Sequence, residues 1–186
     1  MPISQIVTNS IASGQTITSP VIAGTPTGVG VLTLGTAVAS TSGTSIDFTS
    51  IPSWVKRITV NFNGVSTNGA SNYLIQLGTS GTPTTSGYSA VSSIVYNTGF
   101  GTASSTAGFI LYASAAVYAF YGSQVITITS GNTWETQGVI ANTATTPFTT
   151  ISAGGVTLGG VLNMVRITTA NGTDTFDAGT INILYE

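Results

Sequence analysis

From residue 31 onward, short runs of β-branched and aromatic residues alternate with clusters of Gly, Ser, Thr and Asn. This punctuation is typical of β-strands separated by turns, and turns every 8–12 residues or so indicate a sandwich or barrel. Helix capping boxes followed by an apolar period of 3.6 residues are absent from the sequence. The pattern predicts strands near residues 31–39, 45–49, 55–65, 72–78, 88–96, 107–113, 117–121, 124–129, 134–141, 156–169 and 179–185, the penultimate one split or bent at Gly159–Gly160.

Alternation with a period of two is clearest in the segments WVKRITVNF (54–62) and TINILYE (180–186). In the first segment the even positions hold Trp54, Ile58, Val60 and Phe62, so we expect Trp54 to lie in the core with the other three. In the second segment the odd positions are apolar and share a face. The dipeptides at 63–64, 68–69 and 171–172 are all Asn-Gly, which favours turns with positive φ.

About ten strands joined by short turns predict an all-β, antiparallel β-sandwich, and we expect it to be jelly-roll-like. No repeat of fixed period is present, which disfavours a β-helix. Residues 1–29 carry no charge, are rich in Ser, Thr, Gly and Pro, and hold only sparse apolar pairs. We expect them to form an extended N-terminal arm on another surface, with a disordered leader as the alternative. Residues 30–186 then form the sandwich domain.

The stretch 108–122 (GFILYASAAVYAFYG) is the most apolar part of the chain. It is shorter than the roughly 20 residues that a membrane helix requires, and its tyrosines fall in the middle instead of at the ends. A helix over 107–121 is an alternative, but its aromatic and β-branched residues favour strands. The first ten residues have neither a positive start nor a compact apolar core, so we expect no secretory signal and no membrane insertion.

Composition narrows the possible functions. Of 186 residues only three are Lys or Arg and five are Asp or Glu, and there is no His and no Cys. Without His and Cys, disulfides, zinc sites and the usual general base are excluded, so we expect neither an enzyme nor a bound cofactor or metal. Three basic residues cannot form a track for nucleic acid. Disorder is disfavoured, because 41% of residues are hydrophobic and the net charge is only −2.

The few charges are expected to have structural roles. Arg57 and Arg166 lie within predicted strands, and strand arginines are usually paired, so we expect partners among Asp47, Asp174, Asp177 and Glu186, within or between subunits. Lys56 is expected to extend its ammonium into water, with a functional basic pair of Lys56 and Arg57 as the alternative.

Asp174 and Asp177 stand three residues apart in NGTDTFDAGT. Two carboxylates could begin a calcium site or serve as a glycosidase pair. Both residues also occupy positions typical of turn formers that accept hydrogen bonds from nearby backbone N–H groups, and that is the role we expect. The same segment contains a glycosylation sequon at 171–173, which doubles as a hairpin turn.

Three residues are candidates for binding a receptor or a host-surface glycan, namely Trp134, Tyr88 and Asn132. Trp134 follows a Gly-Asn turn beside Glu135, and an exposed indole among polar neighbours would offer a platform for a sugar. More often, a single tryptophan at the start of a strand covers the core or anchors an interface. The predicted loops 79–88, 97–106 and 130–137 are the corresponding surfaces, because recognition is concentrated on loops.

The stretch GTPTGVGVLTLGTAV, followed by SGTSIDFTSIPSWVKRITVNFNGVSTNGASNYLIQLGTSG, resembles a segment that recurs in tail-fibre and related virion proteins of bacteriophages and prophages. The closing FDAGTINILYE is similar to the final strand of those segments. The resemblance covers residues 24–186 in patches and is densest over 43–81. It implies a β-sandwich head on the virion surface, assembled in the host cytoplasm as a trimer and attached to other virion proteins through residues 1–29.

The sequence therefore leaves three hypotheses from different classes. The first is a structural virion protein, a short tail fibre or head-decoration component, that forms a homotrimer. The second is a tip protein that binds a receptor or glycan during host adsorption. The third, which the absent acid–base groups disfavour, is a glycan depolymerase.

Overall fold

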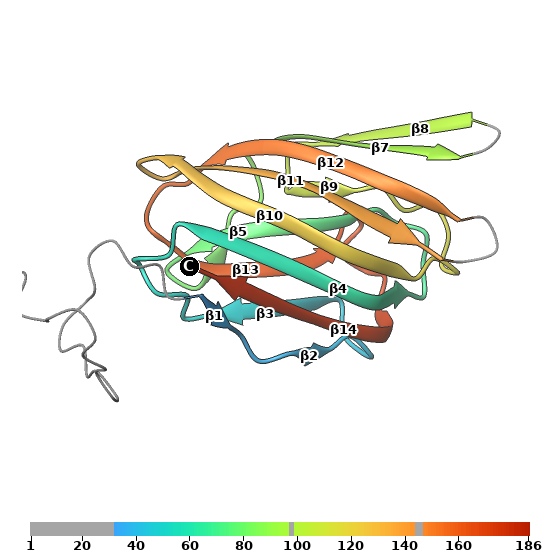
Figure 1. The fold of residues 1–186 in the computed structure, drawn as a ribbon, viewed down its shortest axis with the longest axis horizontal. Helices are drawn as coiled ribbons and strands as arrows, with labels where there is room; N and C mark the ends of the chain where they lie inside the picture. Colours follow the sequence, from blue (N-terminus) through green and yellow to red (C-terminus); the bar gives the residue numbers. More distant parts are fainter. Residues whose placement is uncertain (1–31, 97–98, 144–146) are drawn as a thin grey trace, which may run out of the picture. The chain divides into compact units, whose positions relative to one another are not determined.

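The computed structural model describes residues 32–96, 99–143 and 147–186, and the expected arm at 1–29 lies outside them. The described residues form two antiparallel sheets of nine and five strands, packed face to face as a sandwich (Figure 1). The predicted fold class is therefore confirmed. The strands are β1 (Thr33–Leu34), β2 (Val38–Ala39), β3 (Ser45–Thr49), β4 (Arg57–Thr67), β5 (Tyr73–Thr79), β6 (Thr82–Pro83), β7 (Ser89–Tyr96), β8 (Gly99–Ser105), β9 (Phe109–Leu111), β10 (Phe120–Ser130), β11 (Thr133–Asn142), β12 (Phe148–Thr157), β13 (Leu162–Thr169) and β14 (Phe176–Tyr185).

The chain passes back and forth between the two sheets. The smaller sheet has the order β3-β13-β5-β6, and β9 also pairs with β5. The larger sheet has the order β1-β14-β4-β10-β11-β12-β7-β8, and β2 also pairs with β14. In the larger sheet the meander β10-β11-β12 lies between β4 and β7, and β14 pairs with the other edge of β4 (Figure 1).

The alternation predicted for residues 54–62 holds within β4 and fails just before it. Ile58, Val60 and Phe62 are buried, whereas Trp54 is 42% exposed and Val55 is buried instead. The expectation of a core Trp54 is therefore wrong. Residues 53–54 form a turn ahead of the strand, so the period of two does not extend back to them. The Trp54 ring packs instead on Tyr185, with the ring centroids 6.0 Å apart.

Two strands that the sequence did not predict, β8 and β12, contain runs of Gly, Ala and Ser. β8 reads GFGTASS, and most of β12 is Ser, Thr, Ala and Gly, yet both pair along their length with β7. The predicted strands at 117–121 and 124–129 are one continuous strand, β10. The helix alternative for 107–121 is wrong, since β9 and the start of β10 occupy its ends. No helix among the described residues is long and apolar enough to cross a membrane.

Two glycines allow the close approach of β4 and β14. Gly64 (φ 67°) and Gly179 (φ 91°) lie where the register between these strands shifts. A Cβ added at Gly179 would stand 2.4 Å from the Gly64 carbonyl oxygen, which is too close for any side chain. Asn63-Gly64 is therefore part of a bulge within β4 and not the predicted turn. Residues 171–172 likewise make no hairpin, because β13 and β14 belong to different sheets.

Hydroxyl groups join the two sheets around β9. Ser152 of β12 donates to the Ile110 carbonyl at 2.6 Å, and Thr150 donates to the Tyr112 carbonyl at 3.4 Å. Ser92 of β7 accepts from the Tyr112 N–H at 3.0 Å. All three hydroxyl residues are buried on the inner face of the larger sheet. Buried Ser and Thr thus satisfy backbone groups of β9 and of Tyr112, the residue that follows it, in the opposite layer.

Candidate functional site

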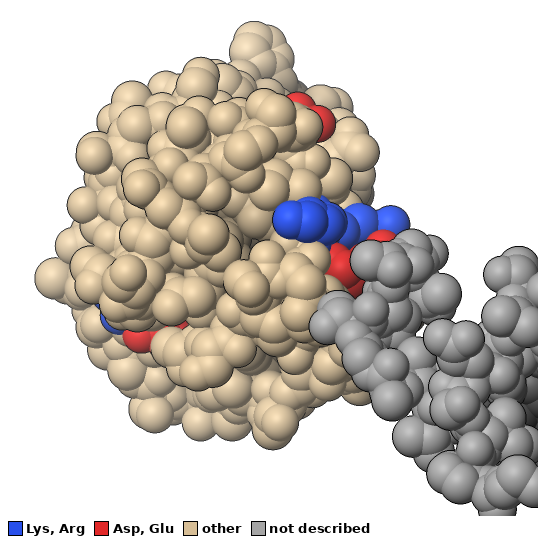
Figure 2. Space-filling view, turned by 90° about the vertical axis from the view of Figure 1, so that its left-hand side faces the viewer, with Lys and Arg blue, Asp and Glu red and all other residues tan. Residues whose placement is uncertain are grey.

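Both predicted arginine pairs form within the chain. Arg166 makes two 2.7 Å hydrogen bonds to the Asp47 carboxylate across β13 and β3, and these bonds raise the pKa of Arg166 further. Arg57 lies 3.0 Å from Glu186. The side chains of Arg57 and Arg166 are 51% and 30% exposed, so both pairs lie at the surface. Figure 2 shows the charged side chains as small separate groups on an otherwise uncharged face.

Asp174 joins two loops that are distant in sequence. Its carboxylate accepts the Ser71 N–H at 3.0 Å and the Asn171 side-chain N–H at 2.6 Å. A Cβ at Gly69 would overlap this carboxylate, so the glycine provides its space. Asp177 accepts a hydrogen bond from Ser66. Asp174 thus has the backbone-bonding role that we expected, and among the described residues no group of three or more His, Cys, Asp or Glu comes together.

Tyr88 is a core residue and does not reach the surface. It is 3% exposed, and its hydroxyl accepts the Leu77 N–H at 2.7 Å. Its ring meets Phe109 edge to face, with the ring centroids 5.0 Å apart. Burial raises the pKa of Tyr88 to about 12. The proposed role of Tyr88 in receptor binding is therefore wrong, because a ring enclosed between the sheets cannot touch an external ligand.

Trp134 is also buried, at 2% exposure, so it is not the exposed sugar platform that we considered. As the second residue of β11 it pairs with Ile128 and Val156, and its side chain points into the sandwich. Asn132, in the turn before β11, is half-buried. Trp134 and Asn132 nevertheless line the same small pocket, so the sequence pointed to two residues that do come together.

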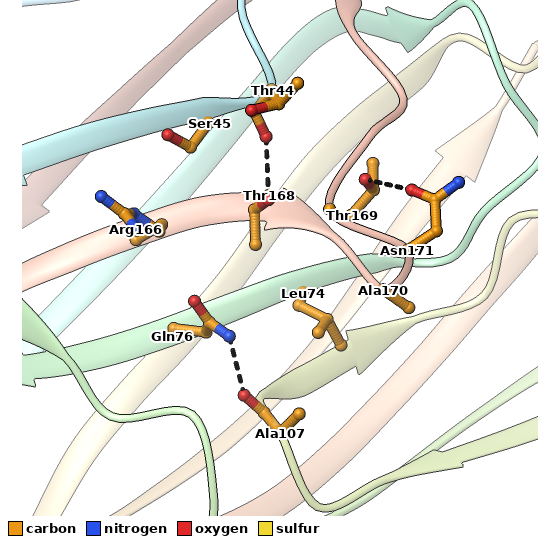
Figure 3. Close-up of a pocket in the computed structure, with 11 residues that line it drawn as sticks. Thr44, Ser45, Leu74, Gln76, Ala107, Arg166, Thr168, Thr169, Ala170 and Asn171 are labelled. Atoms are coloured by element: carbon orange, nitrogen blue, oxygen red, sulfur yellow. Dashed lines mark hydrogen bonds between the residues drawn. The ribbon is translucent and has the colours of Figure 1, made fainter.

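A shallow polar hollow of about 330 Å³ lies over the smaller sheet. Figure 3 shows its lining side chains from β3, β5 and β13 and from the loop after β13. Several of its polar groups already have partners, since Gln76 donates to the Ala107 carbonyl at 2.9 Å and Thr168 donates to the Thr44 carbonyl at 2.8 Å. No aromatic side chain lines the hollow. It offers hydroxyl and amide oxygens, and its Arg166 is held by Asp47.

The outer face of the larger sheet carries an apolar patch on β7, β8, β11 and β12. Val139 lies directly across from Ile151, and Val95 directly across from Phe100. The patch residues are each 53–79% exposed. Its members are Val91, Val95, Phe100, Val139 and Ile151. The sequence did not locate this patch, because the strands β8 and β12 were not predicted.

The described part of the chain is thus an antiparallel β-sandwich whose outer surface carries an apolar patch, a polar hollow and a small pocket beside Trp134. No protein-family model, curated protein or solved structure matches the chain.

Proposed function

We propose that the protein is a structural component of a bacteriophage virion, either a short tail fibre or a head-decoration protein, that assembles on the particle surface as a homotrimer. The resemblance of residues 43–81 and of the final strand to virion segments supports the assignment to a phage particle. Residues 1–29 are proposed to attach the head to other virion proteins.

The apolar patch is the observation that carries the proposal of assembly. Val, Ile and Phe side chains that are half or more exposed stand together on a flat sheet face. Contiguous apolar patches of this kind mark interaction surfaces in folded proteins. No charged residue lies among the patch positions, so identical copies can approach without repulsion or the desolvation of an ion. A patch of this composition suits the contact between subunits of an oligomer.

The first test is particle composition and mass. We expect peptides of this chain in density-purified virions, and a solution mass three times the chain mass of 18.7 kDa by light scattering after size exclusion. Absence from the particles would overturn the virion assignment. A stable monomer at micromolar concentration would overturn the trimer.

The second test places a charge in the apolar patch. Ile151→Lys buries an unpaired ammonium if the patch is the subunit contact, so we expect the trimer to dissociate. Thr49→Lys is the matched control, because it adds the same charge to an exposed position on the smaller sheet. If Ile151→Lys remains as trimeric as Thr49→Lys, the patch is not the contact.

A second candidate function, recognition of a host-surface glycan, is favoured by the polar hollow. Its position on an open sheet face leaves room for several sugar rings, and hydroxyl and amide oxygens are suitable partners for neutral sugars. We expect Thr168→Val to reduce adsorption to host cells, with Thr49→Val as the control at a position outside the hollow. Equal adsorption of the two variants would remove the hollow from consideration.

A further inference from the structure

A small pocket of about 80 Å³ opens where the turn between β10 and β11 faces the loop before β4 and the start of β13. It joins three segments that are far apart in sequence. Val55, Leu162 and the Trp134 ring give it buried apolar walls, and Ser53 and Asn132 contribute polar groups. The pocket therefore combines apolar walls with polar groups in a space that holds only a few non-hydrogen atoms.

The indole N–H of Trp134 has no hydrogen-bond partner among the described residues, although the residue is only 2% exposed. An indole N–H is a donor only, and buried tryptophans usually find an acceptor for it. A buried donor without a partner calls for an explanation such as a bound group. Trp134 lines the pocket, so the unpaired donor belongs to a side chain of its wall, and a small movement of that wall would let an acceptor in the pocket reach it.

Lys56 gives the pocket a positive charge. Both ion pairs among the described residues use arginines, Arg57 and Arg166, so the Lys56 ammonium has no ionic partner there. The backbone of Lys56 is held on both sides, because its N–H donates to the Glu186 carbonyl at 2.7 Å and its carbonyl accepts the Ile128 N–H at 3.0 Å. The backbone of Lys56 is thus held beside the pocket, and the acceptor that best suits its ammonium is an anion.

We propose that this pocket binds the carboxylate of an acidic sugar such as a uronic acid. A carboxylate has two oxygens, which can accept from the Trp134 indole and the Lys56 ammonium, while its carbon packs against the apolar walls. A phosphate would need a nest of backbone N–H groups to satisfy its additional oxygens. The rim groups Ser53 and Asn132 suit ring hydroxyls, and the turns around the pocket offer no open strand edge to bind a peptide.

This site depends neither on the proposed trimer nor on the polar hollow. It is tested by titrating the isotope-labelled full-length protein with sodium glucuronate, with glucose as the neutral sugar and sodium acetate as the carboxylate without a ring, at constant ionic strength. The chain has two tryptophans, and the exposed Trp54 serves as the internal control. We expect glucuronate to shift the Trp134 indole resonance saturably, glucose to leave it unchanged, and acetate to bind at least about tenfold more weakly.

Variants then identify the groups that bind. Lys56→Gln should weaken glucuronate binding by at least about tenfold, because it removes a charge-assisted contact. Arg57→Gln is the matched control, since it removes a neighbouring charge that is already paired with Glu186, and should leave the affinity unchanged. The spectrum of Trp134→Phe lacks the Trp134 indole resonance and so identifies that signal. No shift of the Trp134 signal with glucuronate, equal binding of acetate, or an unaffected Lys56→Gln variant would each overturn the proposal.

Discussion

Tyr73 and Tyr88 show how burial alters the acid–base behaviour of single residues in a chain with few charges. Both are 2–3% exposed. Burial, more than any other effect, raises the pKa of each to about 12, from an ordinary value of about 10. Hydrogen bonds from the Thr67 side chain and the Leu77 backbone act in the opposite direction and are smaller. In the folded protein both phenols therefore keep their protons well above pH 10.

We predict a loss of stability at alkaline pH. The contribution of these tyrosines is fully present below pH 10 and is lost as the pH rises to about 12, because only the unfolded chain releases the protons in that window. The loss should reach about 2–3 kcal/mol for each tyrosine. Denaturant unfolding measured from pH 8 to pH 12 checks this. Formation of tyrosinate by all seven tyrosines of the folded protein near pH 10 would contradict it.

The variant Tyr88→Phe separates the hydrogen bond that the Tyr88 hydroxyl accepts from the effect of its ionisation on stability. At pH 8 it should lower the free energy of unfolding by about 1–3 kcal/mol, because the buried Leu77 N–H loses its acceptor. Above pH 10 its stability should fall less steeply than that of the wild type. Tyr121→Phe, at a 41% exposed position, is the control and should change neither quantity appreciably.

At the scale of elements, the pairing of β4 with β14 depends on the glycines that face each other across it. Gly179 has both a positive φ and a carbonyl where a Cβ would lie, whereas Gly172 has a positive φ and open space around it. The two positions therefore separate the cost of backbone conformation from the cost of a steric clash.

We predict that Gly172→Ala lowers the free energy of unfolding by about 1–2 kcal/mol and that Gly179→Ala lowers it by substantially more. In Gly172→Ala stability is lost only because alanine must adopt the left-handed conformation. In Gly179→Ala the new Cβ also forces β4 and β14 apart. Thermal and denaturant unfolding of both variants provide the comparison. If both variants lose the same stability, the close contact between the strands is not the cause.

The sequence could predict those elements whose own side chains determine them. β4 and β14 alternate β-branched or aromatic with polar residues, and their buried faces were predicted correctly from Ile58 onward. β8 and β12 both pair with β7, and the runs of Gly, Ala and Ser within them do not indicate strands on their own. Trp54 is exposed instead of buried, because a turn ahead of β4 decides the direction of its side chain, whereas Trp134 at the start of β11 is buried, as is more often the case for a tryptophan in that place.

The candidate sites were predicted only in part, because most of them depend on which distant segments of the chain meet in the fold. With eight charged residues in the chain, the possible arginine partners were few, and both pairs fell within the predicted set. The pocket beside Trp134 joins residues 53–56, 131–134 and 161–162, and no local pattern indicates that these segments meet. The apolar patch likewise requires the register of four strands.

At the scale of the whole molecule, folding depends on apolar burial and hydrogen bonds and little on charge. Both ion pairs among the described residues are partly exposed, and pairs of this kind contribute about 0–1 kcal/mol each. The chain contains no His or Cys that would ordinarily titrate near neutral pH.

We therefore predict that the free energy of unfolding changes by less than about 1 kcal/mol between 50 and 500 mM sodium chloride, and that it is nearly constant from pH 5 to pH 9. Asp47→Asn, which breaks the pair with Arg166, should cost no more than about 1 kcal/mol. Urea unfolding, which does not add ions, measures the salt dependence, the pH dependence and the effect of Asp47→Asn. A sharp transition near pH 6–7 would show that a titrating group has been overlooked.

The buried hydroxyl bonds around β9 also have a mechanical consequence. Ser152 and Thr150 of one layer bind carbonyls of residues 110 and 112 in the other, so a force that slides one layer along the other stretches these bonds together. Side chains in a purely apolar interface can slip past one another by small steps, whereas bonds with fixed partners must break before any slip occurs. The two sheets therefore resist sliding in that direction until these hydrogen bonds break. Ser152→Ala would lower the force required, because it removes the shortest of them.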